Sequence, residues 1–180
     1  MAGQLVQVAT NTVSSAVSSV ILTGINDDSV YMLAITNMDS SNTTASSYHY
    51  PYIRFTESGT PNTTTNYDFA GKLLYSGGAF GNIANTNNDD IQLNLVHIGT
   101  GANQTVQGIY YIYNAYNSSE FTFCTIEGVG ITTSSENALY GGNGGAVLTQ
   151  TTQVDGVELS WSSSQTITSG TFTLYRQVGS

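Results

Sequence analysis

The chain has 180 residues, of which only 8% are charged, and its formal net charge is −9. Besides two histidines, its basic side chains are Arg54, Lys72 and Arg176. Binding to nucleic acid depends on clustered lysines and arginines that meet phosphates, so this composition argues against a nucleic-acid partner. No shift in composition divides the chain, and we expect a single domain over residues 1–180.

The apolar part of the composition is rich in aromatic side chains. Twelve tyrosines, six phenylalanines and Trp161 supply large apolar areas, and the polar part is rich in serine, threonine, asparagine and glycine. Threonine and tyrosine fit a pleated surface, whereas asparagine and glycine adopt the backbone angles of tight turns. The composition therefore predicts strands joined by turns. Since Cys124 is the only cysteine, we expect the fold to be held without disulfides.

The N-terminal segment is polar with a few valines, which predicts an arm or an edge strand over residues 1–20. It contains neither a basic segment nor a long apolar run, so we expect no signal peptide. No stretch of the chain is apolar enough, over a sufficient length, to span a bilayer. We therefore expect no membrane partner.

Four segments between residues 31 and 126 have the apolar pattern of strands. Residues 31–36 and 91–95 alternate between apolar and other side chains, which indicates strands buried on one face. Residues 109–113 and 121–126 are apolar at nearly every position, which indicates central strands covered on both faces.

The C-terminal part shows two more alternating segments, at residues 157–161 and 171–175. The dipeptide Asp155-Gly156 predicts a two-residue hairpin turn, because aspartate tolerates and glycine freely adopts a positive φ. Ser169-Gly170 predicts a second turn in the same way.

The segments between these strands are rich in serine, threonine, asparagine and glycine, and we expect loops at residues 39–47, 58–66, 81–90 and 134–145. One or two turns of helix fit best at residues 68–75. Many short strands with turn signals between them predict an all-β fold, an antiparallel two-sheet β-sandwich of jelly-roll-like type, in preference to a propeller or a solenoid.

Several sequence blocks occur in an order that resembles tailed-bacteriophage virion structural proteins. They are TVSSAVSSVILTGI leading into SVYMLAITNM, then YIRFTESGTPNTTTNYDFAG, NSSEFTFCTIEGV, GGAVLTQTTQVDGVELSW and a closing ITSGTFTLYRQ with its Ser-Gly-x-Phe-x-Leu-Tyr motif. The likeness covers nearly the whole chain. It departs at Arg176-Gln177, where the family pattern has a glycine and a hydrophobic residue.

The resemblance implies a component of a phage particle, which is made in the cytoplasm of the bacterial host and mounted on the virion surface. Such proteins are decoration proteins, fibre domains or adhesin tips, and they are often homotrimers. The resemblance implies a structural or binding role, with capsid or tail proteins as further partners, and it transfers no catalytic residue.

Catalytic chemistry has little support in the residues themselves. Cys124 lies in an apolar segment, where a small buried thiol is a core residue. Neither His49 nor His97 has metal-ligand spacing to another histidine, cysteine or carboxylate, and a buried, hydrogen-bonded ring is the simplest interpretation of His97. We expect no catalytic residue, cofactor or metal site.

Two polar segments are candidate ligand sites. Residues 85–90 are rich in oxygen ligands that calcium accepts, but they lack the EF-hand pattern, so a solvated loop is the better interpretation. Residues 141–145 are glycine-rich, but they lack the Lys-Ser/Thr of a phosphate-binding loop, and we expect a flexible loop or turn.

Three functional hypotheses follow. The first is a virion protein that is mounted on the phage particle as a homotrimer and acts by subunit packing, which requires exposed apolar patches on the isolated subunit. The second is a tail or fibre-tip module that binds a receptor or a host-surface glycan through exposed aromatic and amide side chains. The third is a polysaccharide-degrading enzyme, which requires a close pair of carboxylates in a cleft and has no motif here.

We expect contacts between subunits at the arm of residues 1–20 and at the last strand, residues 172–178, because terminal strands can add to a neighbouring sheet. A second expected contact surface is the tyrosine-rich segment before and after Pro51, although an aromatic edge strand explains that segment equally well. The candidate interface residues are Tyr48, Tyr50, Tyr52, Phe172, Leu174 and Tyr175.

Overall fold

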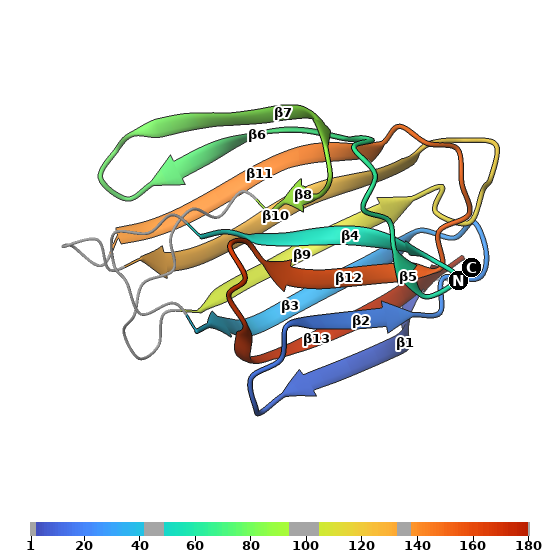
Figure 1. Ribbon diagram of the computed structural model, residues 1–180, viewed down its shortest axis with the longest axis horizontal. Coiled ribbons are helices and arrows are strands. Elements are labelled where there is room, and N and C mark those ends of the chain that lie inside the picture. The colour runs from blue at the N-terminus through green and yellow to red at the C-terminus, as the bar shows by residue number, and fades with distance from the viewer. Residues whose placement is uncertain (1–2, 42–48, 94–104, 133–137, 180) are drawn as a thin grey trace.

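The computed structural model describes residues 3–41, 49–93, 105–132 and 138–179, and these form two antiparallel β-sheets packed face to face (Figure 1). The larger sheet has eight strands in the order β1-β13-β3-β9-β10-β11-β6-β7. The smaller sheet has the order β2-β12-β4-β5, and β8 pairs with β4. Within the described residues no helix forms, so the prediction of an all-β, antiparallel two-sheet sandwich is confirmed.

The eight-stranded sheet consists of β1 (Gln4–Val13), β13 (Ile167–Val178), β3 (Tyr31–Ser40), β9 (Val106–Tyr113), β10 (Thr122–Thr132), β11 (Ala138–Leu148), β6 (Tyr67–Tyr75) and β7 (Phe80–Asn88). The smaller sheet consists of β2 (Ser19–Thr23), β12 (Gly156–Trp161), β4 (Pro51–Glu57), β5 (Thr60–Pro61) and β8 (Ile91–Gln92). In Figure 1 the smaller sheet lies in front of the larger one, and β6 and β7 extend beyond it.

The core lies between the two sheets and is filled by alternate residues of their strands. The period-two pattern of β3 and β12 is confirmed, since the alternating side chains of both strands are buried. Each large apolar side chain that is buried in this way contributes about 1.5–3 kcal/mol. The largest buried side chains are Trp161, Tyr31, Tyr67, Tyr110, Phe55 and Phe172.

The two ends of the chain lie beside each other. Strand β1 is an edge strand, and it pairs with the last strand, β13, from the Gln4–Val178 pair to the Val13–Gly170 pair. Because β13 also pairs with β3 on its other side, both of its edges are occupied within the chain. Among the described residues β13 thus has no open edge to add to a neighbouring subunit's sheet, contrary to the expectation, whereas β1 pairs on one side alone.

The prediction that residues 109–113 and 121–126 are covered on both faces is wrong. Residues 109–113 belong to β9 and residues 122–126 to β10, and only the inner face of these strands meets the smaller sheet. Their outward side chains are exposed to solvent, with Ile109 at 44% and Phe123 at 46%. Apolar residues at successive positions therefore mark a sheet with two apolar faces, one of which the described residues leave exposed.

Neither predicted turn in the C-terminal part forms. Strand β12 pairs with β2 and β4, so Asp155-Gly156 leads into a strand between two others and does not close a hairpin. Ser169-Gly170 lies inside β13, where the pairing with β3 shifts register on both sides of Ser169. Gly170 has a φ of 139°, which a β-bulge accommodates and a side chain would resist.

Several expected loops and the expected helix are strands. Most of residues 81–90 lie in β7, the described part of residues 134–145 lies in β11, and residues 68–75 lie in β6. Glycine and asparagine lower the intrinsic strand propensity of these segments, but β11 pairs along its length with β10 and β6, and this pairing outweighs propensity. The flexible loop expected at residues 141–145 is thus a central strand.

Two further segments agree with the sequence in part. Residues 58–66 form a turn and loop that contains only the short strand β5. Of the strand expected at residues 91–95, residues 91 and 92 form β8 and Leu93 is buried, while residues 94 and 95 lie outside the described residues. In the part of the chain that the structure describes, no helix has the length and apolar character needed to cross a bilayer.

Candidate functional site

The outer face of the eight-stranded sheet, which points away from the core, carries the largest group of exposed apolar side chains. They come from β6, β7, β9, β10 and β11, and their exposed fractions lie between 36% and 78%. We call this group the outer patch. Its members are Leu74, Phe80, Ile109, Tyr111, Phe123, Val129, Ile131 and Leu139.

Strand register places part of the outer patch in continuous rows. Val129 pairs with Gly141, Gly141 with Leu74, and Leu74 with Phe80, so one row crosses four strands. A Cβ atom at Gly141 would lie 3.6 Å from the Leu74 Cδ1 atom, which shows that Leu74 lies over the glycine. Because Gly141 has no side chain, Leu74 covers this position and the apolar row is continuous across the strands.

A second part of the outer face is hollowed because small residues form its floor. Thr125 pairs with Gly145, Gly145 with Ala70, and Ala70 with Ala84, which gives a row of small residues across β10, β11, β6 and β7. This hollow measures about 520 Å³. Phe123 is among the larger side chains that line it. The outer face thus combines raised apolar rows with a depression.

Between these two regions runs a polar row. Glu127 on β10 pairs with Asn143 on β11, Asn143 pairs with Lys72 on β6, and Lys72 pairs with Asn82 on β7. The Lys72 ammonium donates a hydrogen bond to the Asn82 side-chain oxygen. In the five strands β6, β7, β9, β10 and β11 the charged residues are Lys72, Glu127 and Asp68, so the outer face is poor in charge.

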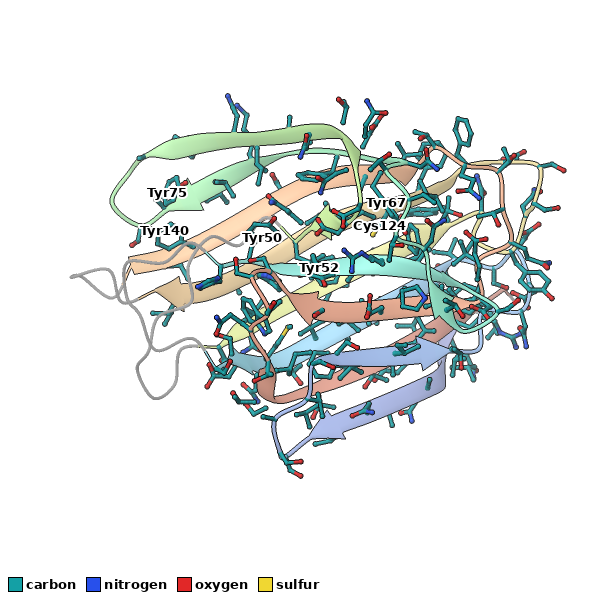
Figure 2. The ribbon with its side chains drawn as sticks, viewed as in Figure 1. Tyr50, Tyr52, Tyr67, Tyr75, Cys124 and Tyr140 are labelled. Atoms are coloured by element: carbon teal, nitrogen blue, oxygen red, sulfur yellow. The ribbon has the colours of Figure 1, made fainter. Side chains whose placement is uncertain are left out.

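A second candidate site lies on the smaller sheet, where Tyr50 and Tyr52 stand beside a polar hollow (Figure 2). The guanidinium carbon of Arg54 lies 4.6 Å from the centre of the Tyr52 ring, and Arg54 Nη1 donates to the Tyr52 hydroxyl at 3.1 Å. Arg54 Nη2 also donates to the Asp89 carboxylate at 2.7 Å. Asp90 lines the same hollow.

The charges at this hollow are held in place by ion pairs in which the carboxylates outnumber the guanidinium. Glu158 lies 3.7 Å from Arg54 Nη1, so the single guanidinium faces more than one carboxylate. Burial, and next the neighbouring Asp89 carboxylate, raise the pKa of Asp90 to about 6. Serine hydroxyls complete the lining of the hollow, at Ser18, Ser160, Ser162, Ser163 and Ser164. This arrangement suits a neutral ligand with hydroxyl groups.

The structure separates the interface residues expected from the sequence. Tyr50 and Tyr52 lie at the polar hollow, whereas Tyr48 lies outside the described residues. Phe172 and Leu174 are fully buried in the core, so their side chains are not available to a partner. Tyr175 is partly exposed on β13.

The expectation for Cys124 is confirmed. It is a free, buried cysteine, and burial raises the pKa of its thiol to about 12, as expected of a core residue. His49 is partly buried, and His97 lies outside the described residues.

The loop expected at residues 85–90 is wrong in its backbone, although residues 85–87 are exposed to solvent as expected. Residues 85–88 end β7, and Asp90 is buried, where the Asn88 side-chain nitrogen donates to its Oδ1 atom at 2.8 Å. Among the described residues, no group of three or more histidine, cysteine, aspartate or glutamate side chains is arranged to hold a metal ion.

The sequence contains a signal for the outer patch in two apolar runs, which by themselves predict burial on both faces. Alternate positions of β9 and β10 face the core, and the positions between them supply Ile109, Tyr111, Phe123 and Val129 to the outer face.

Comparisons with protein-family models, with curated proteins and with solved structures return no match for this chain.

Proposed function

We propose that this chain is a non-enzymatic structural protein of a bacteriophage particle, a capsid decoration or head-fibre component that acts by subunit packing. The observation that carries this proposal is the outer patch. Isolated subunits rarely expose continuous apolar surfaces of this kind unless the surface contacts a partner. The expectation of exposed apolar side chains on the subunit is thus met, and the sequence resemblance supplies the class of particle.

The composition of the outer face supports a packing role. The centre of a protein–protein interface is typically apolar, rich in aromatic residues and poor in charge. The outer patch includes Phe80, Phe123 and Tyr111, and the five strands that carry it contain three charged residues. The net charge of −9 is compatible with a virion surface position that does not attract packaged DNA.

The test is an averaged cryo-EM density of the intact particle. We expect copies at regular positions on the head, with the outer face of the eight-stranded sheet against a protein neighbour. Copies confined to the tail would favour the alternative role described below. A particle without the chain, or copies whose outer face is open to solvent, would contradict the proposal.

A binding assay with particles that lack the chain separates packing from other roles. We expect Phe80→Ser and Leu139→Ser each to lower the occupancy of the chain on the particle, because both remove exposed apolar area from the outer patch. The matched control is Ile21→Ser on β2, whose side chain is 41% exposed but belongs to the smaller sheet. Equal losses for all three variants would argue against a specific role of the outer patch.

The alternative is a receptor-binding or glycan-binding module at a tail or fibre tip. Its support is the polar hollow, since tyrosine faces stack on sugar rings and serine, arginine and aspartate side chains bond their hydroxyls. A glycan array should then give hits that Tyr50→Ala and Tyr52→Ala abolish. An array without hits would count against this role and leave the packing role intact.

A further inference from the structure

We propose that the outer face of the eight-stranded sheet binds a second copy of this chain about a two-fold axis that runs parallel to β11. The inference rests on the proposed function, because it assigns a partner to the same surface. Two-fold homodimers are the commonest closed assemblies, and their interfaces must be self-complementary. The register of the outer face provides this complementarity in charge and in side-chain size.

The charges define the axis. The polar row has Glu127 on one side of Asn143 and Lys72 on the other, one strand away in each direction. A two-fold rotation about a line along β11 exchanges these two sides. Glu127 of each copy then faces Lys72 of the other, and Asn143 faces its own copy. The contact gains two ion pairs from the charges that stand nearest to the axis.

The other two-fold arrangement of the same faces is disfavoured. If the axis ran across the strands along the polar row, Glu127 would face Glu127 and Lys72 would face Lys72. Like charges placed opposite each other at an interface are costly. The chain already carries a net charge of −9, so its copies repel each other unless the contact itself is complementary. This comparison selects the axis along β11.

Lys72 is suited to this role because its charge has no carboxylate partner among the described residues. In the part of the molecule that the structure describes, the ion pairs involve Arg54 and Arg176, and Lys72 donates to the Asn82 amide. Glu127 is likewise exposed and has no ion-pair partner in the same described residues. Both charges are therefore available to a second copy.

Side-chain size follows the same symmetry. Glu127 on β10 pairs with Ile109 on β9, so Tyr111 on β9 lies beside Thr125 on β10. Tyr111 therefore belongs to the same row as the small residues. The proposed axis places Tyr111 of each copy over Ala84 of the other, and Val129 over Leu74. Tyr111 thus meets a small side chain at the hollow, and Val129 meets an apolar one in the row that contains Leu74, as packed sheets require.

The first experiment measures the mass of the purified full-length chain in solution as a function of concentration. We expect a dimer. Glu127→Lys and Lys72→Glu each place like charges opposite each other, and each should weaken dimerisation by at least about tenfold in Kd. The double variant restores opposite charges in exchanged positions and should recover the dimer. A dimer that tolerates both single variants, or a double variant that stays monomeric, overturns the proposed axis.

A cross-linking experiment tests the axis directly. Asn143→Cys places a thiol opposite its own copy, across two sheets that pack about 10 Å apart, so a short bis-maleimide should join the copies. The control is Asn82→Cys in the same polar row, two strands from β11. The proposed axis separates its two copies by about four strand spacings, roughly 19 Å, so it should not cross-link. Cross-linking of Asn82→Cys, with or without cross-linking of Asn143→Cys, would contradict the arrangement, because the rival axis along the polar row places both residues opposite their own copies.

The outcomes separate this inference from the proposed function. A monomer that still occupies the particle through the outer patch would overturn the two-fold pairing and leave the packing role standing. A trimer, which the sequence resemblance implies, would do the same. A dimer that never associates with the particle would instead overturn the virion role and leave the pairing intact.

Discussion

The carboxylate of Asp155 accepts a hydrogen bond from the Thr56 Oγ1 atom at 2.6 Å. Its other oxygen accepts the Gly59 backbone N–H at 2.7 Å. The backbone carbonyl of Asp155 accepts the N–H groups of Gly24 and Ile25 at 2.9 Å and 3.0 Å. One residue before β12 therefore fixes the end of β2, the end of β4 and the turn after β4.

Asp155→Ala should lower the free energy of unfolding by about 1.5–3 kcal/mol, because the Thr56 hydroxyl and the Gly59 N–H both lose a charged acceptor. Urea unfolding at neutral pH measures the change. Asp155→Asn is the matched control, since it keeps one acceptor oxygen, and it should lose about half as much. If Asp155→Ala unfolds at the same urea concentration as the native chain, these hydrogen bonds contribute nothing to the free energy of unfolding.

The same dipeptide illustrates what the sequence could not provide. Asp155-Gly156 has the chemistry of a tight turn, but glycine is needed here for a different reason. A Cβ atom at Gly156 would lie 2.3 Å from the Leu22 carbonyl oxygen and 2.9 Å from the Thr56 Oγ1 atom. The requirement arises from the close approach of β2 and β4, which are distant in sequence, so local turn chemistry could not predict it.

The fold was predictable where one face of a strand meets the core. The alternation of Tyr31, Leu33 and Ile35 reports this burial directly. Strands β7 and β11 were missed because their glycine and asparagine residues carry no such alternation, and their pairing partners stabilise them. The outer patch could not be predicted because its members Ile109 and Phe123 belong to continuous apolar runs. Such a run indicates that both faces of the strand are apolar. It does not indicate whether this chain or another molecule covers the outer face.

Gly170→Ala should destabilise the chain by at least about 2 kcal/mol, because the residue has a φ of 139° that strains any side chain. The added Cβ atom would also lie 2.9 Å from Phe172 Cζ and 3.0 Å from Met38 Cα. The control is Gly77→Ala, which meets nothing within 4 Å and should change stability by less than about 0.5 kcal/mol. Equal midpoints of urea unfolding for the two variants would contradict the role of the bulge.

Cys124 should be protected from thiol reagents in the folded chain. Its side chain is 2% exposed, and burial raises the pKa of the thiol to about 12, so little reactive thiolate is present at pH 8. We expect the labelling rate with a disulfide reagent to rise by at least about 1,000-fold in denaturing urea, since native chains are open only a fraction of about 10⁻³ of the time or less. Rapid, stoichiometric labelling of the folded chain would contradict a core position.

Asp90 should make the stability of the chain depend on pH between about 4 and 6. Burial, followed by the Asp89 carboxylate, raises the pKa of Asp90 from 3.8 to about 6 in the folded chain. Because the folded state holds this proton more tightly than the unfolded state, its contribution is fully present below pH 3.8 and is lost as the pH rises through about 6. The loss amounts to about 3 kcal/mol at most.

Asp90→Asn removes this titration while keeping an oxygen that can accept the hydrogen bond from Asn88. We expect the unfolding free energy of the native chain, minus that of the variant, to fall as the pH is raised from 4 to 7 in a series of urea titrations. Asp28→Asn, at an exposed position, is the matched control, and its difference from the native chain should not reproduce the fall assigned to Asp90. If the Asp90→Asn difference instead stays constant or rises over this range, the buried carboxyl group is ionised at a lower pH than its surroundings indicate, and the polar hollow carries a full additional negative charge.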